Sequence, residues 1–213
     1  MPALVILFFS SLVIAYSGAM MPGPMLTAVI AETPRHGFMT GPLVVLGHAI
    51  LELVLLMVLA IGLSEFLTND AFTAALSLVG GAMLIVTAVT MIVGVARDRV
   101  SLEWGAGDSG LKTRAVLSGV VSSLANPYWT IWWATIGLSL LTKAYALGAA
   151  GIAVFYVGHI LGDLTWYSAV SGAMAAGRRF ITLRVYKTML CTAAAFLLVL
   201  ATWFIASGVR YLS

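Results

Sequence analysis

Two short segments of the sequence repeat one pattern of polar residues within apolar surroundings. They read GHAILEL at 47–53 and GHILGDL at 158–164, each with Gly, His, an acid four residues after the His, and Leu. The chain has only three His and eight acids, and this pattern uses two of each. Residues i and i+4 share one face of a helix, which places each His one turn from its acid. Such groups can relay protons, bind an amine or hold a divalent cation.

The composition indicates that these residues lie in a membrane protein. The 213 residues are 62% hydrophobic and 9% charged, with a mean hydropathy of +1.07, whereas a soluble domain is about a quarter charged. We therefore interpret the net charge of +3 as a topology signal and predict no nucleic-acid partner. The single cysteine, Cys191, excludes an intramolecular disulfide and argues against a thiol carrier.

Six apolar segments are each long enough to cross a bilayer, which needs ~20 residues. They cover roughly 3–30, 38–62, 72–95, 114–140, 147–175 and 188–209. Six passes place nine of the eleven Lys and Arg residues on one side, and only Lys143 and Arg210 on the other. The positive-inside rule then predicts a multi-pass protein of the cell (inner) membrane with the nine bases in the cytoplasm and both termini outside.

The two His–acid pairs fall about halfway through the second and fifth segments. His48 and Glu52 belong to one, and His159 and Asp163 to the other. No Lys or Arg lies at that depth, so the acids must be protonated, paired with His or solvated in a cavity. One such pair is equally well explained as a neutral carboxyl bonded to its own His. Two related pairs favour binding of substrate or protons.

Two segments contain residues that interrupt a helix. MMPGPM at 20–25 contains Pro22, Gly23 and Pro24, and LANPYW at 124–129 contains Asn126 and Pro127. Proline removes a backbone hydrogen bond and disfavours helix at the preceding residue. One kink alone is commonly structural. Two breaks in corresponding segments indicate backbone that lines a site, because broken helices at membrane depth must face protein or water.

The breaks and the His–acid pairs recur in the same order in both halves of the chain. We predict an all-α integral membrane protein with six transmembrane helices, arranged as two inverted three-helix repeats with helices 1 and 4 broken at the proline motifs. Residues 1–213 form one domain. Repeat one covers about 1–95, a cytoplasmic connector about 96–113, and repeat two about 114–213.

Small and aromatic residues flank these motifs. The glycines predicted to allow close helix packing are Gly37, Gly41, Gly47, Gly158 and Gly162. Three tryptophans, Trp129, Trp133 and Trp166, either mark the membrane interface or line a cavity where they contact an ammonium group. Assembly into a homo-oligomer remains open.

Several of these motifs together resemble the LysE/RhtB family of amino-acid exporters. They are Pro22-Gly23-Pro24, Arg35-His36-Gly37, Gly41 with Gly47 and Glu52, Gly62-Leu63, and the Asn-Pro element in SLANPYW at 123–129. The resemblance extends over most of the chain. The chain departs from the family pattern at Leu51–Glu52, where the family more often has Gly-Asp, and at His48.

The resemblance implies a secondary active exporter of amino acids or related amino-bearing solutes, driven by the proton-motive force. Its partners would be the small-molecule substrate, protons and membrane lipids. We predict no cofactor and no enzymatic activity, because no nucleophile constellation is evident. The alternative is a divalent metal-cation exporter that uses His48, Glu52, His159 and Asp163 as ligands. A membrane scaffold or enzyme subunit is a third class.

Overall fold

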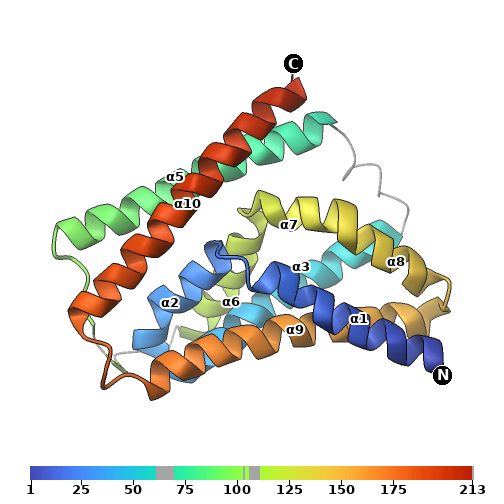
Figure 1. The fold of residues 1–213 in the computed structure, drawn as a ribbon, viewed down its shortest axis with the longest axis horizontal. Coiled ribbons are helices and arrows are strands. Elements are labelled where there is room, and N and C mark those ends of the chain that lie inside the picture. Colours follow the sequence, from blue (N-terminus) through green and yellow to red (C-terminus); the bar gives the residue numbers. More distant parts are fainter. Residues whose placement is uncertain (61–69, 103, 106–110, 213) are drawn as a thin grey trace.

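The first half of the chain forms a series of helices, seen in the computed structural model (Figure 1). The structure describes residues 1–60, 70–102, 104–105 and 111–212. Its first elements are α1 (Pro2–Ala19), α2 (Pro24–His36), the short 3-10 helix η1 (Gly37–Met39), α3 (Thr40–Ala60) and α5 (Asp70–Ala96). Gly62 and Leu63, which belong to the motifs quoted above, lie outside the described residues.

The second half follows a similar order. It consists of α6 (Leu111–Leu124), α7 (Pro127–Trp132), the π-helical turn η2 (Trp133–Gly137), α8 (Leu138–Tyr145), α9 (Gly148–Ala176) and α10 (Leu183–Leu212). No strand occurs in the described part of the chain. The predicted all-helical class is therefore confirmed.

Five segments are long and apolar enough to cross a membrane. They are Pro2–Ala19, Pro24–Leu59, Ser77–Ala96, Gly148–Ala176 and Leu183–Tyr211. The predicted fourth segment, 114–140, is divided among α6, α7, η2 and α8, each shorter than the ~20 residues of a full span. Length and composition thus support a multi-pass membrane protein.

Local sequence explains where the interrupted helices restart. Gly23 is extended (φ −151°), and Pro24 opens α2 at a position where its missing N–H removes no helical bond. Asn126 is also extended, and its side-chain oxygen accepts a hydrogen bond from the backbone N–H of Tyr128 at 3.2 Å. Pro127 opens α7 in the same way as Pro24 opens α2. Gly23 lies next to the Asn126 side chain, so the two restarts face each other.

The helices pack in two groups. The long helices α5 and α10 lie side by side (Figure 1), with Leu84, Leu197 and Phe204 buried between them. In the other group α9 lies along α1, while α3 packs against both α6 and α9. Helix α2 contacts members of both groups and connects them.

Glycines allow α3 and α9 to approach their neighbours closely. A Cβ atom on Gly47 would lie 1.9 Å from the Val116 oxygen of α6, and one on Gly158 would lie 2.7 Å from the Phe8 oxygen of α1. Gly162 packs on Ala15, and Gly41 packs on the backbone of Tyr167. Each Gly-His motif therefore contacts the interrupted segment of the other half of the chain.

Gly37 has a different structural role from these four glycines. Its surroundings are open, and its φ of +65° lies in a region that L side chains rarely adopt. It is the first residue of η1, directly after α2, where the chain turns toward α3. Backbone conformation, not helix packing, therefore accounts for glycine at this position.

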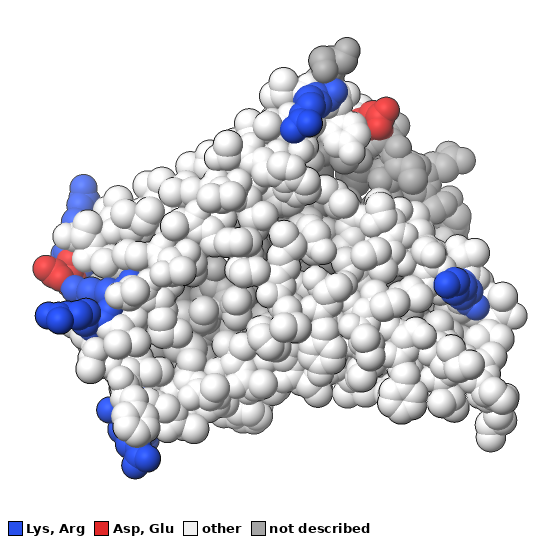
Figure 2. Space-filling view, viewed as in Figure 1, with Lys and Arg blue, Asp and Glu red and all other residues white. Residues whose placement is uncertain are grey.

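Basic side chains gather at one end of the molecule. Figure 2 shows most of the visible Lys and Arg there, where α2, α5 and α9 end and α6 and α10 begin. The Lys187 ammonium donates a short hydrogen bond to Asp98 and holds the pKa of that carboxyl below its ordinary value. This ion pair joins the segment after α5 to α10.

We expect the Asp98–Lys187 pair to add a small, pH-dependent stability. A lowered pKa stabilises the folded state at pH values above the ordinary Asp pKa, and the contribution is lost as the pH falls through the folded-state value. Asp98→Asn should slightly lower the thermal midpoint in detergent at pH 7 and low salt, and the drop should become smaller at pH 3. Asn tolerates the positive φ of 51° at this position. A drop of equal size at pH 3 would contradict this assignment.

Candidate functional site

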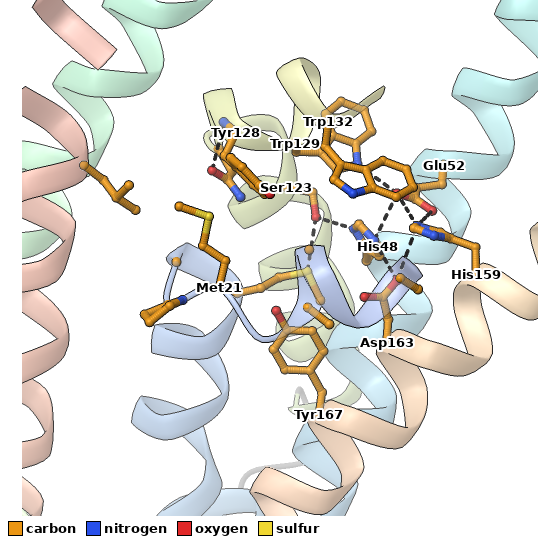
Figure 3. A pocket seen from close by; sticks show the side chains of 18 residues that line it. Met21, His48, Glu52, Ser123, Tyr128, Trp129, Trp132, His159, Asp163 and Tyr167 are labelled. Atoms are coloured by element: carbon orange, nitrogen blue, oxygen red, sulfur yellow. Dashed lines mark hydrogen bonds and ion pairs between the residues drawn. The ribbon is translucent and has the colours of Figure 1, made fainter. Parts of the chain in front are cut away.

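A cavity lies where the two interrupted segments meet α3 and α9. Its lining residues come from the ends of α1 and α6, the starts of α2 and α7, the middles of α3 and α9, and Leu200 of α10. Figure 3 shows their side chains converging from these elements. Among the described residues that line it, none is Lys or Arg. The charge of the cavity is therefore set by His48, Glu52, His159 and Asp163.

These four side chains form one buried cluster. The side chains are at most 6% exposed. His48 Nε2 lies 3.1 Å from Glu52 Oε1 and 3.4 Å from Asp163 Oδ2. His159 Nε2 lies 3.1 Å from Glu52 Oε2 and 3.6 Å from Asp163 Oδ2. Each His thus contacts both its own acid and the acid of the other helix.

Two tryptophans hold the Glu52 carboxylate. Trp133 Nε1 donates to Oε1 at 2.8 Å, and Trp129 Nε1 donates to the same oxygen at 2.9 Å. Both indoles follow the restart at Asn126, so α7 and η2 position them against α3. Paired donors stabilise a buried acceptor that would otherwise be costly to remove from water.

Ser123 orients the His48 ring. The Ser123 hydroxyl donates to the Gly119 oxygen at 2.7 Å, and its oxygen lies 2.7 Å from His48 Nδ1. Because the hydroxyl proton is used on Gly119, Ser123 accepts a hydrogen bond from the His48 Nδ1–H. This leaves His48 Nε2 facing Glu52 and Asp163.

His159 is held by aromatic rings. The centroid of its ring lies 4.6 Å from the centroid of the Trp132 ring and 6.2 Å from that of the Phe155 ring. His159 Nδ1 is buried without a hydrogen-bond partner in the structure. The two His residues therefore have similar contacts at Nε2 but different surroundings at Nδ1.

The structure brings most of the predicted site residues to this cavity. Pro22, Gly23, Asn126 and Trp129 line it with the four titratable residues. Trp133 contacts Glu52 from behind the lining. Pro24 and Trp166, also predicted at the site, do not line the cavity, and the buried Nε1 of Trp166 has no hydrogen-bond partner.

Sequence reasoning missed the parts played by Ser123, Met25 and Trp132. Met25 lies in the wall of the cavity, and its sulfur is 3.5 Å from the Ser123 hydroxyl oxygen. The signal in the sequence was the closeness of these residues to the predicted helix break: Ser123 precedes Asn126 by three residues, and Trp132 follows it by six. These residue types are common in membrane helices, and nothing in their spacing indicated that they meet a His.

Comparison with known proteins places this chain in a family. The family model for the LysE type translocator matches residues 16–208. The chain belongs to the LysE family. A relative from Bacillus subtilis (strain 168), named "Putative amino acid efflux protein YcgF", is 25% identical over 207 residues, which cover 97% of this chain and 98% of the relative. No solved structure matches the chain.

LysE membership confirms the resemblance inferred from the sequence motifs. The matched range includes the restart at Pro22–Pro24, the restart at Asn126, and both Gly-His motifs. LysE proteins are translocators, so this chain is assigned to membrane transport of a small molecule. The buried four-residue cluster is the feature of its structure that suits such a role.

Proposed function

We propose that this LysE protein exports an amino acid or a related amino-bearing solute in exchange for protons. The observation that carries the proposal is the cluster of His48, Glu52, His159 and Asp163, buried at the meeting point of two interrupted helices. Family membership and the name of the Bacillus subtilis relative support the transport of amino acids.

The helix arrangement supports a six-pass topology with two inverted repeats. In this proposal α1 with α2 forms the first pass, and α6 to α8 together form the fourth. The packing of α1 on α9 corresponds to that of α6 on α3, since each contact involves the Gly of a Gly-His motif. An odd number of passes in each copy would invert the second copy in the membrane. Residues 96–113 would connect the copies within one domain of 213 residues.

Charge supports an orientation for this topology. The basic end in Figure 2 would face the cytoplasm, as the positive-inside rule requires. Both termini would then lie on the outer side of the inner membrane. The substrate would enter the cavity from the basic end and leave at the opposite end.

The cavity offers complementary groups for the two ends of an amino acid. Asp163 Oδ2 is buried without a hydrogen-bond donor, which suits it to accept an ammonium group. Trp129 and Trp132 line the same cavity, and their rings would add cation–π attraction. The start of α2 and the Asn126 side chain would contact the carboxylate of the substrate.

The contacts of the His48 Nε2 atom support proton coupling. With its Nδ1–H bonded to Ser123, a neutral His48 presents a lone pair at Nε2 toward two carboxyl oxygens. Acceptors this close repel each other unless a proton lies between them. The cluster must therefore carry protons when no other cation is present. An arriving ammonium group would displace a proton, which couples the two fluxes.

Gradient-driven efflux from proteoliposomes tests the proposal. Vesicles loaded with a mixture of amino acids are placed in acidic medium, and the released solutes are identified by mass spectrometry. We expect the wild-type protein to release one group of amino acids, and Asp163→Asn to release them no faster than protein-free vesicles. Asp98→Asn is the matched control and should keep wild-type rates, because Asp98 lies outside the membrane spans. Full gradient-driven efflux by Asp163→Asn would contradict proton coupling through this cluster.

A further inference from the structure

We propose that the same four-residue cluster binds one first-row divalent cation, such as Zn²⁺ or Co²⁺, and that this ion inhibits export. Binding of the cation is argued from geometry alone. Only the inhibition rests on the proposed function, because it assumes that the cluster takes part in transport.

The spacing of the ligand atoms suits a tetrahedral ion. One ligand atom from each of the four residues lies within 4.8 Å of all the others. With Glu52 Oε2 and Asp163 Oδ2 as the oxygen ligands, His159 Nε2 lies 3.1 and 3.6 Å from them, and His48 Nε2 lies 3.4 Å from Asp163 Oδ2. A tetrahedral site with bonds of 2.0–2.1 Å has edges of about 3.3 Å. Three of the six edges therefore already have nearly the required length.

Two carboxylate oxygens in the cluster have no other partner. Glu52 Oε2 and Asp163 Oδ2 make no hydrogen bond, although both atoms are buried and belong to residues that are at least nine-tenths buried. Buried carboxylate oxygens are normally satisfied by donors. A cation between them and the two Nε2 atoms would satisfy both.

Surrounding residues orient the ligands as in protein metal sites. Ligating His residues usually donate their second ring N–H to a neighbour, as His48 does to Ser123. The other oxygen of Glu52, Oε1, is held by Trp129 and Trp133. Two imidazoles and two carboxylates suit Zn²⁺ or Co²⁺, whereas Mg²⁺ and Ca²⁺ prefer sites built from oxygen alone.

A bound ion would block transport for two reasons. It would replace the protons that the cluster must otherwise carry, since metal ligands bind in their deprotonated forms. It would also tie α3 to α9, which belong to different halves of the chain. Alternating access requires the two halves to move against each other. A cation that bridges them would hold the protein in one state.

Equilibrium titration of the purified protein in detergent tests the site. We expect one Co²⁺ per chain, with the visible absorption of tetrahedral Co²⁺, displacement by Zn²⁺, and an affinity that rises with pH as protons are released. Double replacement of His48→Gln and His159→Gln should weaken binding by at least about 100-fold, and Ser123→Ala by about 10-fold or more. Size-exclusion profiles would establish that each variant is folded.

The chain provides a matched control for these substitutions. Glu32 and His36 form another His–acid pair four residues apart, with the atoms 2.9 Å apart, but away from the cavity. Glu32→Gln combined with His36→Gln should leave Co²⁺ binding unchanged. Loss of binding in this control, or unchanged binding in the His48–His159 variant, would overturn the assignment. Absence of stoichiometric Co²⁺ binding to the wild-type protein would also overturn it.

Efflux assays separate the site from the proposed function. Zn²⁺ should stop amino-acid release from wild-type vesicles, and a chelator should restore it. Zn²⁺ binding by a wild-type protein that releases no amino acid would support the site and refute the proposed function. Amino-acid release without Zn²⁺ binding would overturn the site alone. Gradient-driven movement of Co²⁺ across the vesicle membrane would overturn inhibition and identify the ion as cargo.

Discussion

Replacement of Glu52 by alanine is expected to destabilise the protein by about 3 kcal/mol and to abolish export. Glu52 is fully buried and contacts four side chains, His48 on its own helix and three on α7, η2 and α9. Alanine would leave the N–H groups of Trp129 and Trp133 without an acceptor, and each buried unsatisfied donor costs about 1–3 kcal/mol. Thermal unfolding in detergent, monitored by size-exclusion chromatography, would measure the loss of stability.

A second substitution at Glu52 separates stability from transport. Glutamine keeps an oxygen that accepts from both indoles, but it cannot take up or release a proton. Glu52→Gln should therefore unfold within a few degrees of wild type and still fail to drive efflux. Glu32→Ala is the control for removal of a His-paired acid, and its partly exposed side chain predicts little loss of stability. A stable Glu52→Ala variant would show that the indole bonds contribute little.

A side chain at Gly47 is expected to separate α3 from α6. A Cβ atom there would lie 1.9 Å from the Val116 oxygen, and the facing Gly119 would meet the Val44 oxygen at the same distance. Backbone atoms cannot move aside as a flexible side chain can, so Gly47→Val should cost about 3 kcal/mol or more. The shift would also pull His48 away from Ser123. We expect poor yield and a lowered thermal midpoint.

Gly18 provides the control for this prediction. A Cβ atom at Gly18 would lie 3.7 Å from Trp132, which is ordinary van der Waals contact. Alanine is about 1 kcal/mol more favourable than glycine inside a helix. Gly18→Ala should therefore be as stable as wild type or slightly more stable. Equal stability of Gly47→Val and wild type would show that the close approach of α3 and α6 is not required.

Local features of the sequence were enough to predict the helical membrane class and the position of the His–acid pairs midway along their helices. Hydropathy depends on composition over about 20 residues, and the i, i+4 relation follows from helix geometry alone. The restarts at Pro24 and Pro127 also follow from local chemistry, because proline suits the first turn of a helix. Family membership was accessible for the same reason, since its motifs are short and continuous.

The contacts that make the cluster a single site depend on how helices cross. Glu52 meets His159 across 107 positions and Trp133 across 81, and His48 meets Ser123 across 75. Whether two helix faces meet depends on crossing angle and rotation, which arise from packing of many side chains. The close contacts at Gly47 and Gly158 bring α3 and α9 against the interrupted segments.

The repeated motif GHxxx-acid-L thus specified two polar pairs in the middle of α3 and α9, each joined within one helix turn. It did not specify that the pairs face each other, that two indoles hold one of the acids, or that Ser123 orients one of the imidazoles. Those features require atoms from distant segments to come within about 3 Å, and hydrogen bonds of that length form only after the helices have packed.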